Sequence, residues 1–137
     1  HVTTLAGVPP LWTDLLEVDW PAEAVASLRR MTNSGGALTL RLVELMRRRF
    51  PAVDLVPMYG LTEAFRSTYL PPHLVDAHPT SIGHAIPHAE VLVVNDAGKP
   101  AGEGEEGELV VRLWRRRRLV WRPGSLAGRA ALLRRTA

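Results

Sequence analysis

The chain has 137 residues, which is room for one domain, and 46% of them are hydrophobic, enough to build a core. It contains no cysteine, which excludes disulfides and thiolate metal sites, so a reducing, cytoplasmic location is expected. No apolar run approaches the length of about 18 residues that a membrane helix needs, and no basic segment leads from His1 into an apolar run. The sequence therefore predicts neither a membrane span nor a signal peptide.

The positive charge is confined to one end of the chain. The formal net charge is +3, but residues 114–137 contain eight arginines and no acidic residue. The preceding 113 residues therefore carry a net charge of −5. A high isoelectric point of this origin describes the end of the chain and predicts no nucleic-acid partner for the body.

Prolines mark the beginnings of two short helices near the start of the chain. Pro9 and Pro21 each precede a segment with apolar residues, and proline suits a first helical turn because the N–H group that it lacks would be unpaired there. A short strand and a glycine-containing loop follow. The elements expected up to residue 36 are helices over 9–16 and 22–28, a strand over 30–33 and a loop over 34–36.

A third helix and a second strand complete a repeating unit. Apolar residues fall at helical spacing between Leu42 and Phe50, and Thr39 is a suitable N-cap. The next strand is expected over residues 54–58. The order strand, glycine loop, helix, strand is typical of a parallel βαβ unit, so the predicted fold class is α/β with a mostly parallel sheet.

The rest of the body is expected to contain a loop excursion and a small β subdomain. Residues 66–89 are rich in proline and lack periodicity, which predicts an ordered excursion over the surface. Two further strands are expected over 90–95 and 107–112, with a turn over 96–99 after the first.

Polar and glycine residues follow both strands of the βαβ unit. Ser34-Gly35-Gly36 comes after the first strand, and Tyr59-Gly60-Leu61-Thr62-Glu63 comes after the second. In open α/β sheets ligands bind outside the carboxyl ends of the strands, so we expect the two loops to share a ligand-binding edge. Taken alone, the second loop also fits a strand followed by a helix that Thr62 caps, and the first fits an ordinary turn.

Three blocks in this order resemble the adenylate-forming superfamily of acyl-CoA ligases, peptide-synthetase adenylation domains and luciferases. They are NSGGAL at 33–38, MYGLTEA at 58–64 and EGELVVR at 106–112. The resemblance covers residues 1 to about 113 and implies that the chain is a fragment of the large AMP-binding domain. The wording AGVPPLW together with YGLTEAFRSTYLPP is similar to acyl-CoA ligases found with exosortase systems.

The resemblance implies a two-step reaction. A carboxylate attacks the α-phosphate of ATP to give acyl-AMP and pyrophosphate, and the thiol of coenzyme A, or of an acyl carrier, then takes the acyl group. It implies that Thr62 and Glu63 are catalytic, with the Thr62 hydroxyl on a phosphate oxygen and Glu63 as a ligand of Mg²⁺. Tyr59 offers a flat face for adenine, and Gly60 permits a close backbone approach. The binding residues implied are Ser34, Gly35, Gly36, Ala37, Tyr59, Gly60, Leu61 and Thr62.

Several parts of this reaction are absent from the sequence. It has no Ser/Thr/Gly-rich phosphate loop that ends in lysine, no later ribose-binding aspartate and no lysine of a small C-terminal domain. Since removing one preorganised donor costs about 10²–10³ in rate, the fragment is expected to be inactive alone. The identity of the acid is open. Helix residues near Trp12 and the loop at 64–66 are candidates for the acyl pocket.

The arginine-rich end has two interpretations. Residues 114–137 are interpreted first as a non-native or disordered tail, because the family pattern after GELVVR breaks off there and the composition is that of GC-rich DNA read out of frame. The alternative is a non-catalytic binding module whose basic tail binds nucleic acid or an anionic membrane. His84 and His88 are a weak metal pair because Pro87 lies between them, and no nucleophile elbow supports a hydrolytic triad.

Overall fold

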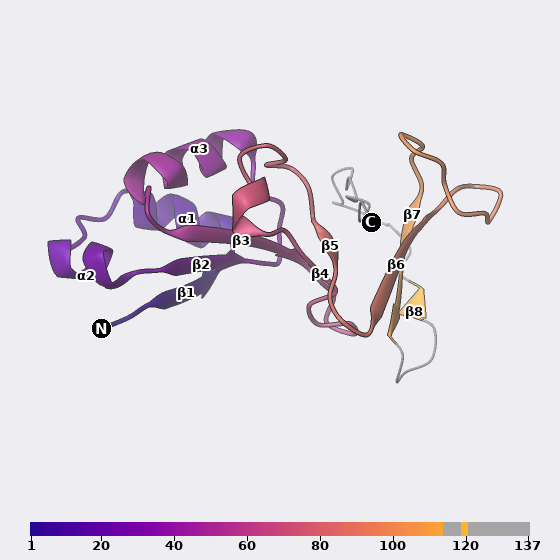
Figure 1. Ribbon diagram of the computed structural model, residues 1–137, viewed down its shortest axis with the longest axis horizontal. Helices are drawn as coiled ribbons and strands as arrows, with labels where there is room; N and C mark the ends of the chain where they lie inside the picture. Colours follow the sequence, from indigo (N-terminus) through magenta and orange to yellow (C-terminus); the bar gives the residue numbers. More distant parts are fainter. Residues whose placement is uncertain (114–118, 121–137) are drawn as a thin grey trace.

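A computed structural model describes residues 1–113 and 119–120 of the chain, and these form two β-sheets with helices packed on the first (Figure 1). In chain order the elements are β1 (Thr4–Gly7), α1 (Pro9–Leu16), α2 (Ala22–Ser27), β2 (Arg30–Asn33), α3 (Leu40–Arg49), β3 (Asp54–Tyr59), β4 (Thr68–Tyr69), the 3₁₀ helix η1 (Pro72–Leu74), β5 (His84–Ala85), β6 (Ala89–Val94), β7 (Glu108–Leu113) and β8 (Leu119–Val120). The predicted α/β fold class is confirmed.

The first sheet has the strand order β1-β2-β3-β4-β5. Strands β1, β2 and β3 are parallel, with Met31 of β2 opposite Leu5 of β1 and Leu55 of β3. Strands β4 and β5 add antiparallel to β3. The predicted βαβ unit is therefore present, and parallel neighbours bring the ends of β1, β2 and β3 to one edge.

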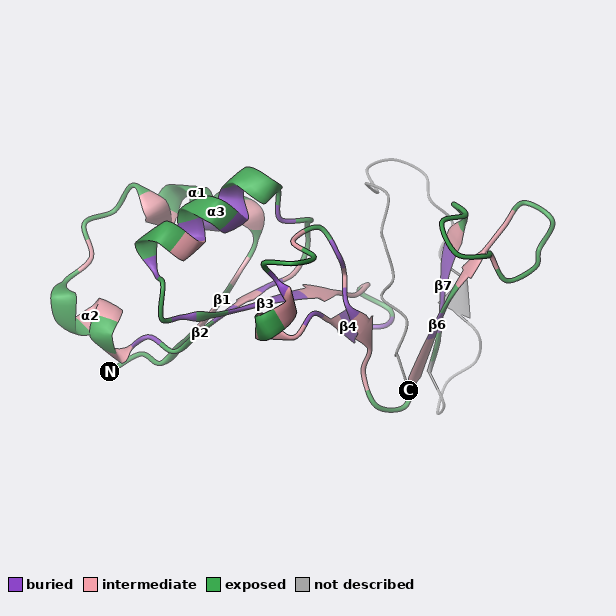
Figure 2. Ribbon diagram, turned by 45° about the horizontal axis from the view of Figure 1, so that its top comes forward, coloured by how far each residue is buried: buried purple, intermediate pink, exposed green. Residues whose placement is uncertain are grey.

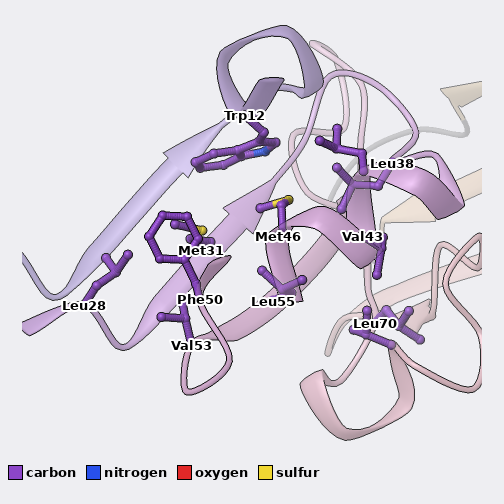
Figure 3. Close-up of a cluster of buried hydrophobic side chains, with 12 residues drawn as sticks. Trp12, Leu28, Met31, Leu38, Val43, Met46, Phe50, Val53, Leu55 and Leu70 are labelled. Atoms are coloured by element: carbon purple, nitrogen blue, oxygen red, sulfur yellow. The ribbon is translucent and has the colours of Figure 1, made fainter. Parts of the chain in front are cut away.

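Helices α1 and α3 lie on the same face of this sheet and cover its core (Figure 2). Helix α3 begins at the expected cap, because the Thr39 hydroxyl accepts a hydrogen bond from the Leu42 amide at 3.2 Å. Its buried side chains meet those of the strands below, and the side chains of Met31, Met46, Phe50 and Leu55 share this core (Figure 3).

The second sheet has the order β6-β7-β8 and lies beyond β4 and β5 (Figure 1). In the antiparallel pair β6 and β7, Val91 lies opposite Val111. A second apolar cluster of Ala64, Val91, Leu109 and Val111 joins this sheet to the loop after β3. The small β subdomain expected from the sequence is thus present.

The expectation that residues 66–89 run over the surface is wrong. The segment is ordered, but Ser67, Thr68, Leu70 and Val75 are fully buried. The reason is that β4 returns along β3 and η1 packs against α3, where Arg47 donates to the Pro72 carbonyl at 3.2 Å. Irregular spacing hid this burial from sequence analysis, because no single face of a helix or strand carries the apolar residues.

Other differences concern boundaries and ends. Strand β1 was not expected, α2 ends one residue early at Ser27, and β3 extends to Tyr59. Interpretations that concern residues 114–137 fall outside the described residues, apart from Leu119 and Val120, which pair with β7. Among the described residues, no helix is long and apolar enough to span a membrane.

Candidate functional site

The two sequence-predicted loops lie at the same edge of the first sheet. Residues 34–36 follow β2 and residues 60–63 follow β3, and β2 and β3 are hydrogen-bonded parallel neighbours. The register places Asn33 opposite Pro57, so β3 extends beyond β2 before its loop begins. This arrangement is the ligand-binding edge of an open α/β sheet.

The first loop is held by a buried asparagine. The Asn33 side chain is 3% exposed, and its Nδ2 donates to the Gly36 carbonyl oxygen at 2.8 Å. Gly35 adopts a φ of 75°, in the left-handed region that favours glycine. Gly35, Gly36 and Ala37 are exposed, so their backbone is open to a ligand while Ser34 is half-buried.

The second loop is a tight turn that closes on itself. The Ser67 amide donates to the Tyr59 carbonyl at 2.8 Å, and the Ala64 amide donates to the Leu61 carbonyl at 3.2 Å. A Cβ atom at Gly60 would lie 1.5 Å from the Phe65 carbonyl oxygen. Gly60 is therefore required for space, which agrees with the close backbone approach expected from the sequence.

Tyr59 lies at the junction between this loop and the second sheet. Its ring is half-buried against the cluster that contains Val91 and Val111, and Leu61 packs there too. The Tyr59 hydroxyl is buried and has no hydrogen-bond partner among the described residues. Burial raises the pKa of this phenol, so the ring is neutral over the physiological range.

Thr62 and Glu63 project from the turn into solvent. Both are exposed, and both immediately follow the residues that fix the loop. In proteins Mg²⁺ is usually bound by one or two carboxylates together with substrate phosphates and water. The described residues contain no cluster of three or more potential metal ligands, so they form no complete metal cage. One accessible carboxylate beside an accessible hydroxyl fits a magnesium ion that arrives with a triphosphate.

The acyl-pocket candidates are only partly accessible. Trp12 is 1% exposed and Ala64 is 3% exposed, so neither side chain lines an open surface. Phe65, in contrast, is 76% exposed, with a φ of 35° and the Arg66 guanidinium 5.3 Å from its ring centre. Of these candidates, Phe65 and Arg66 are the ones that a substrate can reach.

Sequence analysis missed the polar link behind the first loop. The Trp12 indole Nε1 donates to the Asn33 Oδ1 at 2.9 Å, over a separation of 21 residues. Trp12 was identified only as a helix residue, and Asn33 only as the end of a strand. The signal available was an asparagine at the buried end of a parallel strand, where its amide needs partners.

Comparison with known proteins places these features in a family. Residues 1–113 match the model of a family described as AMP-binding enzyme. The acyl-CoA ligase sidI of Beauveria bassiana is 28% identical over 114 residues, which are 81% of this chain and 20% of that protein. The indoleacetate–CoA ligase of Aromatoleum aromaticum is 33% identical over 94 residues, 68% of this chain and 18% of that protein. The chain thus spans about a fifth of the length of these curated relatives.

Solved structures agree in fold. The crystal structure of VinN has a TM-score of 0.71 and 32% identity and covers 83% of this chain and 31% of VinN. The O-succinylbenzoate coenzyme A synthetase MenE of Bacillus subtilis, in complex with ATP and magnesium ion, has a TM-score of 0.69 and 26% identity, covering 82% of this chain and 23% of that one. From the family match over residues 1–113, the shared fold and the glycine and Tyr-Gly-Leu-Thr-Glu loops at one sheet edge, we conclude that the chain belongs to the AMP-binding enzyme family.

Proposed function

We propose that this chain forms part of the nucleotide site of an AMP-forming acyl-CoA ligase, which activates a carboxylate with ATP and passes the acyl group to coenzyme A. The observation that carries the proposal is the convergence of the two loops at one edge, with Thr62 and Glu63 exposed there. Relatives named as CoA ligases support the reaction type.

In this proposal the glycine loop supplies shape. Gly35, Gly36 and Ala37 are exposed and carry small side chains or none, so a ligand can lie directly on their backbone. Ser34 adds a hydroxyl at the start of the loop. The Tyr59 ring, held at its buried side by the second cluster, presents its remaining surface to adenine, and Gly60 keeps the turn beside it tight.

Thr62 and Glu63 supply the polar contacts. The Thr62 hydroxyl donates a hydrogen bond to a phosphate oxygen, and the Glu63 carboxylate holds a magnesium ion without taking a proton. Bound magnesium neutralises phosphate charge as pyrophosphate leaves. Leu61 contributes through packing on the second cluster, which fixes the turn that carries both polar residues.

The acyl acceptor in the proposal is coenzyme A, because several relatives carry that acceptor in their names, including a long-chain-fatty-acid–CoA ligase of Salmonella typhimurium. A carrier protein is the second acceptor to consider, because the similarity extends to a relative whose name does not include coenzyme A. This relative is a plipastatin synthase polypeptide of Bacillus subtilis, 36% identical over 104 residues, which are 76% of this chain and 4% of that protein. The substrate is a small-molecule carboxylic acid in either case.

Binding is the appropriate test, because we expect the 137-residue chain to be inactive alone. Amide resonances of the uniformly ¹⁵N-labelled chain are followed while ATP is added with and without Mg²⁺. The expected result is a saturable shift of amides at 34–37 and 59–63, with the magnesium-dependent part reduced about tenfold in affinity by Glu63→Gln. Glu44→Gln is the matched control, because Glu44 is an exposed glutamate on α3, away from both loops.

Two results contradict the proposal. One is the absence of any shift at these loops at millimolar Mg–ATP. The other is an equal loss of affinity in the Glu63 and Glu44 variants, which shows that only the overall charge matters.

A further inference from the structure

We propose that Trp12 is a positioning residue that sets the conformation of the glycine loop at 34–37 through Asn33. The inference rests on the proposed function only where it concerns the ligand. The hydrogen-bonded link itself is independent of any nucleotide.

Two hydrogen bonds in series join helix α1 to the loop. The Trp12 indole Nε1 donates to Asn33 Oδ1 at 2.9 Å, and Asn33 Nδ2 donates to the Gly36 carbonyl oxygen at 2.8 Å. Trp12 is 1% exposed and Asn33 is 3% exposed, so neither bond is exchanged easily for one with water. Figure 3 shows the Trp12 ring at the border of the main core.

The second bond determines which way the loop backbone faces. All peptide bonds of the described residues are trans, and in a trans peptide the C=O and the following N–H point in opposite directions. The Gly36 carbonyl is turned inward to Asn33, so the Ala37 N–H is directed away from Asn33. A buried side chain therefore fixes the orientation of a peptide in an exposed loop.

Further contacts from the end of β1 support the same loop. The Ser34 amide donates to the Gly7 carbonyl at 3.1 Å, and a Cβ atom at Gly35 would lie 3.2 Å from Val8 Cγ1. Trp12 covers Gly7 so closely that a Cβ atom there would lie 2.7 Å from Trp12 Cζ2. Trp12 thus contacts the end of β1 directly and the end of β2 through Asn33.

Removing the indole N–H changes one link and leaves the ring packing. In Trp12→Phe, the Asn33 oxygen loses its donor in a buried place, where an unsatisfied polar group is unfavourable, and the amide is free to rotate. A rotated amide no longer holds the Gly36 carbonyl. The loop must then be ordered by the ligand, and such ordering weakens binding.

The chain offers a matched control. Trp20 also donates its indole Nε1 to a single acceptor, the Leu15 carbonyl, at 2.8 Å, and its ring packs edge-on to Phe50 at 5.1 Å. Trp20→Phe therefore removes the same chemical group from the same helical layer without touching the glycine loop. Any general effect of losing an indole hydrogen bond appears in both variants.

The experiment compares the wild-type chain, Trp12→Phe and Trp20→Phe by amide hydrogen exchange and by titration with Mg–ATP. The expected result for Trp12→Phe is about tenfold faster exchange at Gly36 and Ala37 and about tenfold weaker Mg–ATP binding, both corrected for the variant's global stability. Trp20→Phe is expected to match the wild type in both measurements.

The outcomes separate this inference from the proposed function. If Mg–ATP shifts the loops of the wild type but Trp12→Phe binds it equally well, the positioning role is refuted and the proposed function stands. If the wild type binds no nucleotide, the proposed function fails, and unchanged loop exchange in Trp12→Phe overturns the link as well.

A measurement on the wild type covers the case in which Trp12→Phe does not fold. The indole N–H resonance of Trp12 is expected to shift with the same saturation curve as the Ala37 amide, while that of Trp20 stays in place. Loop amides that shift without the Trp12 indole overturn the inference.

Discussion

Replacing Gly60 by alanine tests whether the turn after β3 needs glycine for space. The φ of Gly60 is negative or extended, since the positive-φ glycines among the described residues are Gly35, Gly83, Gly98 and Gly104. The obstacle is instead the Phe65 carbonyl oxygen, 1.5 Å from the position of the new Cβ atom. Real Cβ atoms come no closer than about 3.0 Å, so the backbone at Phe65 must retreat to about twice its present distance.

That retreat breaks the bonds that close the turn. They are the bond from the Ser67 amide to the Tyr59 carbonyl, the bond from the Ala64 amide to the Leu61 carbonyl, and the bond from the Ser67 hydroxyl to the Ala64 carbonyl. At about 1 kcal/mol of net stability for each bond, Gly60→Ala lowers the free energy of unfolding by about 2–3 kcal/mol. The same rearrangement displaces Thr62 and Glu63, so Mg–ATP binding is expected to weaken.

Gly98→Ala is the control for glycine chemistry. Gly98 has a φ of 73° but nothing within 4 Å of a new Cβ atom, so alanine there meets only backbone strain of about 1 kcal/mol. Urea denaturation of both variants measures the difference, since a slope of about 1–3 kcal/mol per molar urea converts it into a resolvable shift of midpoint. A midpoint for Gly60→Ala at or above that of Gly98→Ala would refute the steric argument.

Two further predictions concern stability. Arg47 donates to Asp76 at 2.9 Å and to the Val53 and Pro72 carbonyls at 3.2 Å each, so Arg47→Ala is expected to lower the free energy of unfolding by about 1–2 kcal/mol, mostly through the carbonyl bonds because Asp76 is exposed. Arg48→Ala, an exposed position on the same helix, is expected to change it by less than about 0.5 kcal/mol, and equal losses in urea denaturation contradict the tether. Burial raises the pKa of the Tyr59 phenol, so the unfolded chain ionises first and the stability present below about pH 10 falls as pH rises through the folded pKa. Urea midpoints between about pH 9 and 11 are expected to fall more steeply for the wild type than for Tyr59→Phe, and parallel curves contradict this assignment.

Local rules account for the elements that were predicted well. The Thr39 cap and the apolar spacing of α3 depend on residues within a few positions of one another, so the sequence alone indicated this helix. The shared edge of the two loops also followed from the sequence, because consecutive parallel strands must end on the same side of a sheet. The roles of the loop residues toward a ligand stay predictions.

Contacts between distant residues account for what the sequence did not reveal. Strand β1 exists because it pairs with β2, whose residues lie more than twenty positions away, and its own four residues carry no strong strand pattern. The burial of Leu70 and Val75 depends on how the chain returns beneath α3 and β3.

The amino-acid sequence by itself determined the order of the main helices and strands, the family resemblance and the edge at which the two loops meet, because these follow from local spacing and from the geometry of parallel strands. Only the tertiary structure decided that Trp12 and Asn33 stand behind the glycine loop and that Phe65 closes over Gly60. Those contacts depend on the three-dimensional approach of backbone and side chains, and residue types and their spacing along the chain do not specify that approach.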